Sequence, residues 1–117
     1  MDRNAAAEKS FEFAVRIVNL YKYLTKEFNE YVLAKQLLRC GTSIGANIAE
    51  AQRGQSRADF AAKMNIALKE TNETLYWLKL LHKTEYLTKM QYDSIDADAR
   101  ELLGLLTSIC KTATKPK

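Results

Sequence analysis

Few residues of this 117-residue sequence could take part in catalysis. The chain has one histidine, His82, and two cysteines, Cys40 and Cys110, that lie far apart along the sequence. A thiol nucleophile needs a base beside it, so Cys40 with His82 is the pair to consider. Cys40 stands at an apolar helical position, however, and thiols buried in helices are usually inert. Both cysteines are therefore interpreted as small buried hydrophobic residues of a reducing compartment, and His82 as a half-buried residue near an apolar face.

Three glutamates form the next candidate group. Glu70 and Glu73 stand three residues apart on one predicted helix face, and Glu50 lies on the preceding predicted helix. Paired carboxylates can act as acid and base or bind a metal. Di-metal bundles use Glu-x-x-His elements, but no histidine follows a glutamate at that spacing here. The sequence thus predicts no metal and no cofactor, and it favours ion pairs of these carboxylates with Arg39, Arg53 or lysines, within one chain or between chains.

The segment 37–54 contains two glycines inside a pattern of helical periodicity. Gly41 and Gly45 each cost about 1 kcal/mol relative to alanine in a helix interior, so they are expected where another backbone comes close. Ala49 continues the same small-residue stripe. The spacing does not match a phosphate-binding loop, because no Lys-Ser/Thr pair follows it. The charges of Arg39 and Glu50 exclude a membrane-spanning dimer helix.

A polar stripe runs beside these glycines. Ser43, Asn47 and Glu50 recur at helical spacing in the same segment. Such groups at the edge of a packed face usually form hydrogen bonds to arginines or to backbone atoms. We therefore predict that they serve structure rather than catalysis.

Composition and periodicity together predict a single all-α domain over residues 1–117. Hydrophobic residues make up 47% of the chain, and its only proline is Pro116. Apolar residues recur at three- and four-residue steps in four stretches, about 5–25, 30–53, 57–83 and 89–111, followed by a basic tail at 112–117. Short links favour an antiparallel up-down-up-down four-helix bundle. Asn29 and Ser56 are the predicted N-caps, and Gly54 is the predicted C-terminal cap of the second helix.

The two middle helices carry more apolar surface than an in-chain core needs, because each has a second apolar arc beside its main stripe. Trp77 stands off the main stripe of the third helix, so an isolated bundle is expected to leave much of it in water. We predict that these second arcs form an interface between subunits. The candidate interface residues are Gly41, Gly45, Ala49, Ile66, Trp77 and Leu80.

Three segments carry a resemblance to a known family: residues 11–24, residues 36–54 with Ser43-Ile44 and Asn47-Ile48-Ala49-Glu50, and residues 70–78 with the sequence ETNETLYWL. They resemble the bacterial four-helix-bundle family that includes proteins encoded in intervening sequences of 23S ribosomal RNA genes. The accessory protein of diversity-generating retroelements is similar. The family glycine that follows Ala-Glu is Ala51 here.

This resemblance implies a cytoplasmic antiparallel bundle that assembles into a homopentameric ring or barrel. The retroelement relatives imply binding of nucleic acid and of a protein partner such as a reverse transcriptase. The sequence itself has no apolar run behind its N-terminal Met-Asp-Arg-Asn and no stretch long enough to cross a bilayer, so we expect a cytoplasmic protein without a membrane partner.

The sequence favours a non-enzymatic, homo-oligomeric assembly protein that binds RNA or DNA electrostatically. A net charge of +4 per chain becomes about +20 in five copies, and surface potential follows the assembled charge. The candidate nucleic-acid contacts are Arg16, Lys22, Arg53, Arg57 and Lys63. The alternative is a protein-interaction adaptor or scaffold that does not bind nucleic acid.

Overall fold

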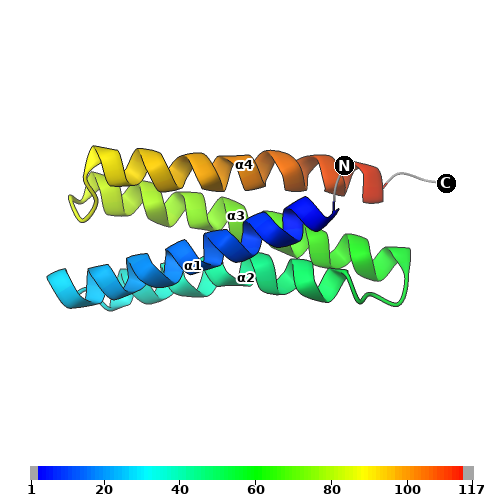
Figure 1. Ribbon diagram of the computed structural model, residues 1–117, viewed down its shortest axis with the longest axis horizontal. Coiled ribbons are helices and arrows are strands. Elements are labelled where there is room, and N and C mark those ends of the chain that lie inside the picture. Colours follow the sequence, from blue (N-terminus) through cyan, green and yellow to red (C-terminus); the bar gives the residue numbers. More distant parts are fainter. Residues whose placement is uncertain (1–2, 115–117) are drawn as a thin grey trace.

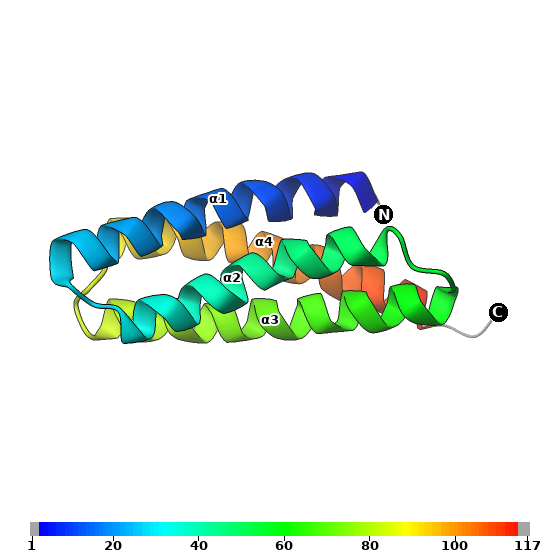
Figure 2. The same cartoon turned by 90° about the horizontal axis from the view of Figure 1, so that it is seen from below.

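The computed structural model describes residues 3–114 and consists of four antiparallel helices over this range. They are α1 (Arg3–Phe28), α2 (Val32–Ala51), α3 (Arg57–Lys83) and α4 (Lys89–Ala113). Figures 1 and 2 show that successive helices run in opposite directions along one elongated body. The predicted all-α, up-down-up-down four-helix bundle is confirmed. Residues 115–117 of the predicted basic tail lie outside the described residues.

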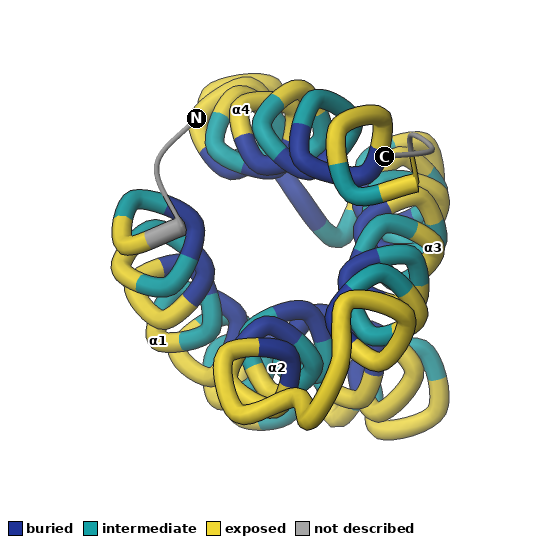
Figure 3. The backbone as a smooth tube through the Cα atoms, turned by 90° about the vertical axis from the view of Figure 1, so that its right-hand side faces the viewer, coloured by how far each residue is buried: buried dark blue, intermediate teal, exposed yellow. Residues whose placement is uncertain are grey.

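The four helices form a ring around one core. Each helix packs against its neighbours in the chain, and α1 packs against α4 to close the bundle. Figure 3 looks along this ring, with buried residues on its inside and exposed residues on its outside. The apolar stripes predicted from three- and four-residue spacing thus face the common axis.

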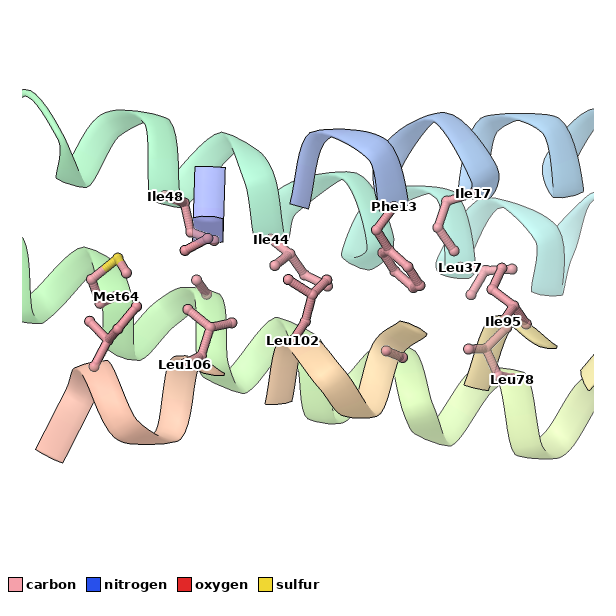
Figure 4. Close-up of a cluster of buried hydrophobic side chains, with 14 of the residues drawn as sticks. Phe13, Ile17, Leu37, Ile44, Ile48, Met64, Leu78, Ile95, Leu102 and Leu106 are labelled. Atoms are coloured by element: carbon pink, nitrogen blue, oxygen red, sulfur yellow. The ribbon is translucent and has the colours of Figure 1, made fainter. Parts of the chain in front are cut away.

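Large apolar side chains from all four helices fill this core. Figure 4 labels Phe13 and Ile17 of α1, Leu37, Ile44 and Ile48 of α2, Met64 and Leu78 of α3, and Ile95, Leu102 and Leu106 of α4. Each such side chain stabilises the folded state by about 1.5–3 kcal/mol when it is fully buried, so burial of apolar surface is the main stabilising term of the fold.

The link between α1 and α2 differs from the prediction that Asn29 is an N-cap. Asn29 has a φ of 52°, and its N–H donates to the carbonyl of Thr25 at 3.2 Å, so it ends α1 instead. Asparagine tolerates this left-handed conformation better than most residues. The Glu30 carboxylate accepts the free N–H groups of Val32 at 2.9 Å and Leu33 at 3.4 Å, so Glu30 supplies the cap of α2.

The remaining helix ends confirm one predicted cap and correct another. The Ser56 side chain accepts the N–H of Asp59 at 3.0 Å, as predicted for the start of α3. Gly54, the predicted left-handed cap of α2, has no positive φ. Its N–H donates to the carbonyl of Ala51 at 3.0 Å, so α2 ends in a tight right-handed turn.

The two glycines of α2 let α1 approach closely. A Cβ on Gly41 would lie 2.8 Å from Cγ1 of Ile17, and one on Gly45 would lie 3.3 Å from the carbonyl oxygen of Ser10. The predicted close packing is confirmed for both glycines, and the helix that approaches them is α1 of the same chain. Their role in a subunit interface stays a prediction.

Gly41 and Gly104 offer a matched test of this packing, because both are glycines inside helices. Gly41→Ala gains helix propensity but pushes against the buried Ile17, so we expect the free energy of unfolding to fall by about 1–2 kcal/mol. A Cβ on Gly104 meets no packed atom of a described residue within 4 Å. Gly104→Ala should therefore raise stability by about 0.5–1 kcal/mol. Urea unfolding followed by circular dichroism measures both, and equal shifts in the same direction would contradict the packing argument.

Candidate functional site

The structure separates the thiol and the imidazole that could have formed a catalytic pair. Cys40 is buried between α2 and α3, where its Sγ accepts a hydrogen bond from Thr74 Oγ1 at 3.3 Å and donates to the Leu37 carbonyl at 3.6 Å. His82 is half-buried near the end of α3 and stacks on Tyr92, with ring centroids 4.5 Å apart. Burial raises the pKa of the Cys40 thiol to about 11. Its reactive thiolate is therefore scarce at neutral pH.

The candidate carboxylates form ion pairs on the outer seam between α2 and α3. Arg39 donates to Glu70 at 3.4 Å and also to Glu73, and Lys63 lies 2.7 Å from Glu50. We call these five residues the polar seam. The predicted ion pairs with Arg39 and with a lysine are present within one chain. Within residues 3–114, no group of three or more potential ligands is arranged to hold a metal.

The other polar residues of this face are bonded within their own helices. Ser43 Oγ donates to the Arg39 carbonyl at 2.6 Å, and Asn47 Nδ2 donates to the Ser43 carbonyl at 2.8 Å. On α3, Trp77 Nε1 donates to Glu73 Oε2 at 3.0 Å. Trp77 is half-buried and packs against the core even in a single chain, so the expectation that an isolated bundle leaves much of it in water is wrong. The reason is that its ring lies along the seam rather than away from it.

The candidate interface residues lie on two different faces. Gly45 and the exposed Ala49 line a groove of about 330 Å³ between α1 and α2. Ile66 is 40% exposed on α3, beside the polar seam, and Leu80 is half-buried near the end of the same helix. Gly41 is buried under α1. The structure therefore brings Gly45 and Ala49 together and keeps them apart from the α3 residues.

The same groove contains an exposed apolar residue that the sequence analysis did not select. Phe11 is 71% exposed and lines the groove together with Ala7, Ala14 and Ala46. We call this surface the α1–α2 groove. Ala7, Phe11, Ala14 and Val18 follow one another at steps of four, three and four residues. This heptad spacing was the signal in the sequence that could have identified it.

Three of the five basic residues predicted to contact nucleic acid have intrachain partners. Arg16 donates to Asp98 at 2.6 Å and to Ser94 Oγ at 2.9 Å, which ties α1 to α4. Lys63 pairs with Glu50. Arg57 donates to the carbonyls of Thr112 at 3.3 Å and Ala113 at 3.4 Å near the end of α4.

Lys22 and Arg53 remain exposed without an ion pair to any residue that the structure describes. They lie near opposite ends of the bundle, so the five predicted residues do not form one continuous basic surface.

A group of lysines gathers at one end of the bundle. Lys22 and Lys26 lie near the end of α1, Lys35 near the start of α2, and Lys79 and Lys83 near the end of α3, at the left of Figure 1. All five are exposed, and none forms an ion pair within the described part of the chain. We call this surface the lysine end. The exposed Glu27 and Glu85 are nearby acids.

Of this group, only Lys22 was predicted from the sequence to contact nucleic acid. The other four could not be ranked from sequence, because pairing with distant carboxylates decides which cations stay available. Among the described helices, none combines the length and the apolar composition that a membrane span requires.

Comparisons with known proteins agree with the fold. The family model described as "23S rRNA-intervening sequence protein" matches residues 2–108. The chain is similar to a protein of unknown function from the S23 ribosomal protein family of Bacteroides thetaiotaomicron VPI-5482, for which a crystal structure has been solved. The two sequences are 62% identical, and the two structures superpose with a TM-score of 0.93. The alignment covers 95% of this chain and 99% of that chain. No curated protein matches the chain.

The burial of the two thiols predicts their chemical behaviour. Because burial raises the pKa of Cys40 to about 11 and also raises the pKa of Cys110, the native protein should react slowly with iodoacetamide at pH 8. Unfolding in urea should make both thiols react at the rate of a free cysteine. Mass spectrometry of alkylated protein follows the reaction, and rapid stoichiometric labelling of native Cys40 would contradict the buried placement.

Proposed function

This chain belongs to the 23S rRNA-intervening sequence protein family, and from that premise we propose that it is a non-enzymatic protein that forms a homo-oligomer and binds RNA or DNA by charge. The proposal places it in the cytoplasm, where two free buried cysteines are common. A ring of five copies is the assembly implied by the resemblance described above.

The α1–α2 groove supports the assembly part of the proposal. Phe11 is a large exposed apolar residue beside a surface of alanine and glycine, which a helix of a second copy can approach closely. Aromatic residues in such positions often dominate the free energy of an interface. Ile66, on α3 beside the polar seam, offers a second apolar contact. Two different faces suit a head-to-tail ring, in which each copy uses one face toward each neighbour.

The lysine end is the observation that carries the nucleic-acid part of the proposal. Its five exposed lysines form no ion pair with a carboxylate of the described residues, whereas Lys9, Lys63 and Lys89 each lie within 3.0 Å of one. Bundles that associate through their sides leave their ends exposed to solvent. A ring would therefore bring several lysine ends together at one rim, which strengthens the local positive potential.

A protein-interaction adaptor is the second candidate, and the α1–α2 groove is the observation that favours it. The groove could bind an amphipathic helix of another protein, such as a reverse transcriptase partner, instead of a second copy. The two functions differ in their response to salt. Binding of nucleic acid weakens steeply as salt rises, and apolar contacts do not.

If the protein forms an oligomer, its mass in solution should be several times the 13.3 kDa of one chain. Phe11→Lys places a charge in the α1–α2 groove and should shift the protein toward monomer without loss of helix. Met90→Lys is the matched control, because Met90 is 82% exposed on α4 and lies outside the groove. Sedimentation velocity measures both variants. A monomeric wild type, or equal effects of both substitutions, would contradict this interface.

Charge location is tested by two triple variants with the same net charge. Lys26→Gln, Lys35→Gln and Lys83→Gln remove three unpaired lysines of the lysine end, and Lys9→Gln, Lys63→Gln and Lys89→Gln remove three paired ones. We expect only the first variant to weaken binding strongly and to reduce the slope of log K against log salt by roughly 2. Fluorescence anisotropy with a labelled oligonucleotide provides the measurement. Absence of salt-dependent binding by the wild type would refute the nucleic-acid function.

A further inference from the structure

An aromatic cluster of the exposed Phe28 and the half-buried Tyr23 and Tyr86 lies at the lysine end. Tyr23 and Phe28 meet edge to face with ring centroids 5.8 Å apart, and Phe28 meets Tyr86 in the same way at 5.3 Å. These rings line a hollow of about 300 Å³ whose wall also includes His82 and Glu85. This volume is at the lower end of the range of small-molecule sites, about 300–1,000 Å³.

Tyr23 and Tyr86 pack against the core, but the core does not account for the position of Phe28. Leu24, one turn before Phe28, is fully buried, and Leu87 is 3% exposed, so the core is already closed at this end of the bundle. Phe28 is nonetheless 43% exposed. An aromatic ring held at the surface beyond a closed core is available for a ligand.

Two fixed turns position the rings before any ligand binds. Asn29 turns the chain directly after Phe28, with a φ of 52°. After α3, Glu85 has a φ of 70°, its N–H donates to the His82 carbonyl at 3.1 Å, and the N–H of Tyr86 donates to the Leu81 carbonyl at 2.9 Å. These hydrogen bonds end α3 in a defined left-handed cap. Binding therefore requires little ordering of the loops that carry the aromatic cluster.

The combination of rings and lysines indicates one class of ligand. Aromatic faces stack on unpaired bases of any sequence, and lysines hold the phosphates between them. Bases of a duplex are stacked on each other and cannot enter a hollow of this kind. We propose that the hollow takes one unstacked base of single-stranded RNA or DNA while the lysine end holds the neighbouring phosphates. The proposal rests on the nucleic-acid function proposed above and specifies the form of its ligand.

Phe28→Leu tests the proposal because it removes the aromatic face and keeps an apolar side chain. Tyr31→Leu is the matched control, since Tyr31 is 48% exposed near the same end and does not line the hollow. Full-length protein is titrated against labelled 12-nucleotide RNA, the same DNA single strand, and a DNA duplex of equal length. We expect Phe28→Leu to weaken single-strand binding roughly 5- to 150-fold and to change duplex binding less than two-fold. Tyr31→Leu should change neither by more than about two-fold.

A second measurement uses only the wild-type protein and so does not depend on the folding of a variant. A 2-aminopurine base within the single strand should lose fluorescence on binding, because it stacks on the aromatic rings. Equal affinity for single strand and duplex, with no effect of Phe28→Leu and no quenching, would overturn this inference and leave the electrostatic function intact. Failure of all three nucleic acids to bind at low salt would instead refute the proposed function itself. A difference between the RNA and DNA single strands would identify which of the two the hollow prefers.

Discussion

The close approach of α1 to α2 is the contact on which the rest of the surface depends. Gly41 lets Ile17 enter the space where a side chain of α2 would otherwise stand. Small residues of both helices permit this close approach and line the groove above it, where Phe11 stays 71% exposed. A leucine at Gly45 would meet the α1 backbone at Ser10 and would force the helices apart. The glycines thus stabilise the core and at the same time shape an outer face.

Ion pairing divides the charges of the bundle into two groups. Along the sides, cations such as Arg16 and Arg39 are paired with carboxylates of neighbouring helices. Exposed pairs of this kind contribute only about 0–1 kcal/mol each to stability. Their larger effect is on local potential, because a carboxylate beside a cation weakens the positive potential at that point, and a lysine without such a partner keeps it. The lysine end is the place within the described residues where five such lysines meet.

Much of the fold could be predicted from sequence, because the core stripe that includes Phe13 recurs with helical period and no proline interrupts the helices. The caps at Asn29 and Gly54 were predicted wrongly, since both residue types suit several positions around a helix end and tertiary packing decides between them. The candidate site was harder to predict. A sequence does not show that Arg16 pairs with Asp98, 82 residues away, whereas Lys26 stays unpaired. Whether a charged side chain stays unpaired depends on contacts between helices, and sequence patterns do not show these contacts.

The location of each reactive group explains why we propose binding rather than chemistry for this bundle. The Cys40 thiol is buried and its pKa is raised, and the carboxylates of Glu70 and Glu73 are held by Arg39. Hydroxyl and amide groups on the α2 face are occupied by carbonyls of their own helix. Exposed apolar residues such as Phe11 and Ile66 lie on the sides of the bundle, whereas the lysines without ion pairs lie at one end together with the exposed Phe28. Association through the sides leaves that end exposed, so assembly and ligand binding can occur together without competing for one surface.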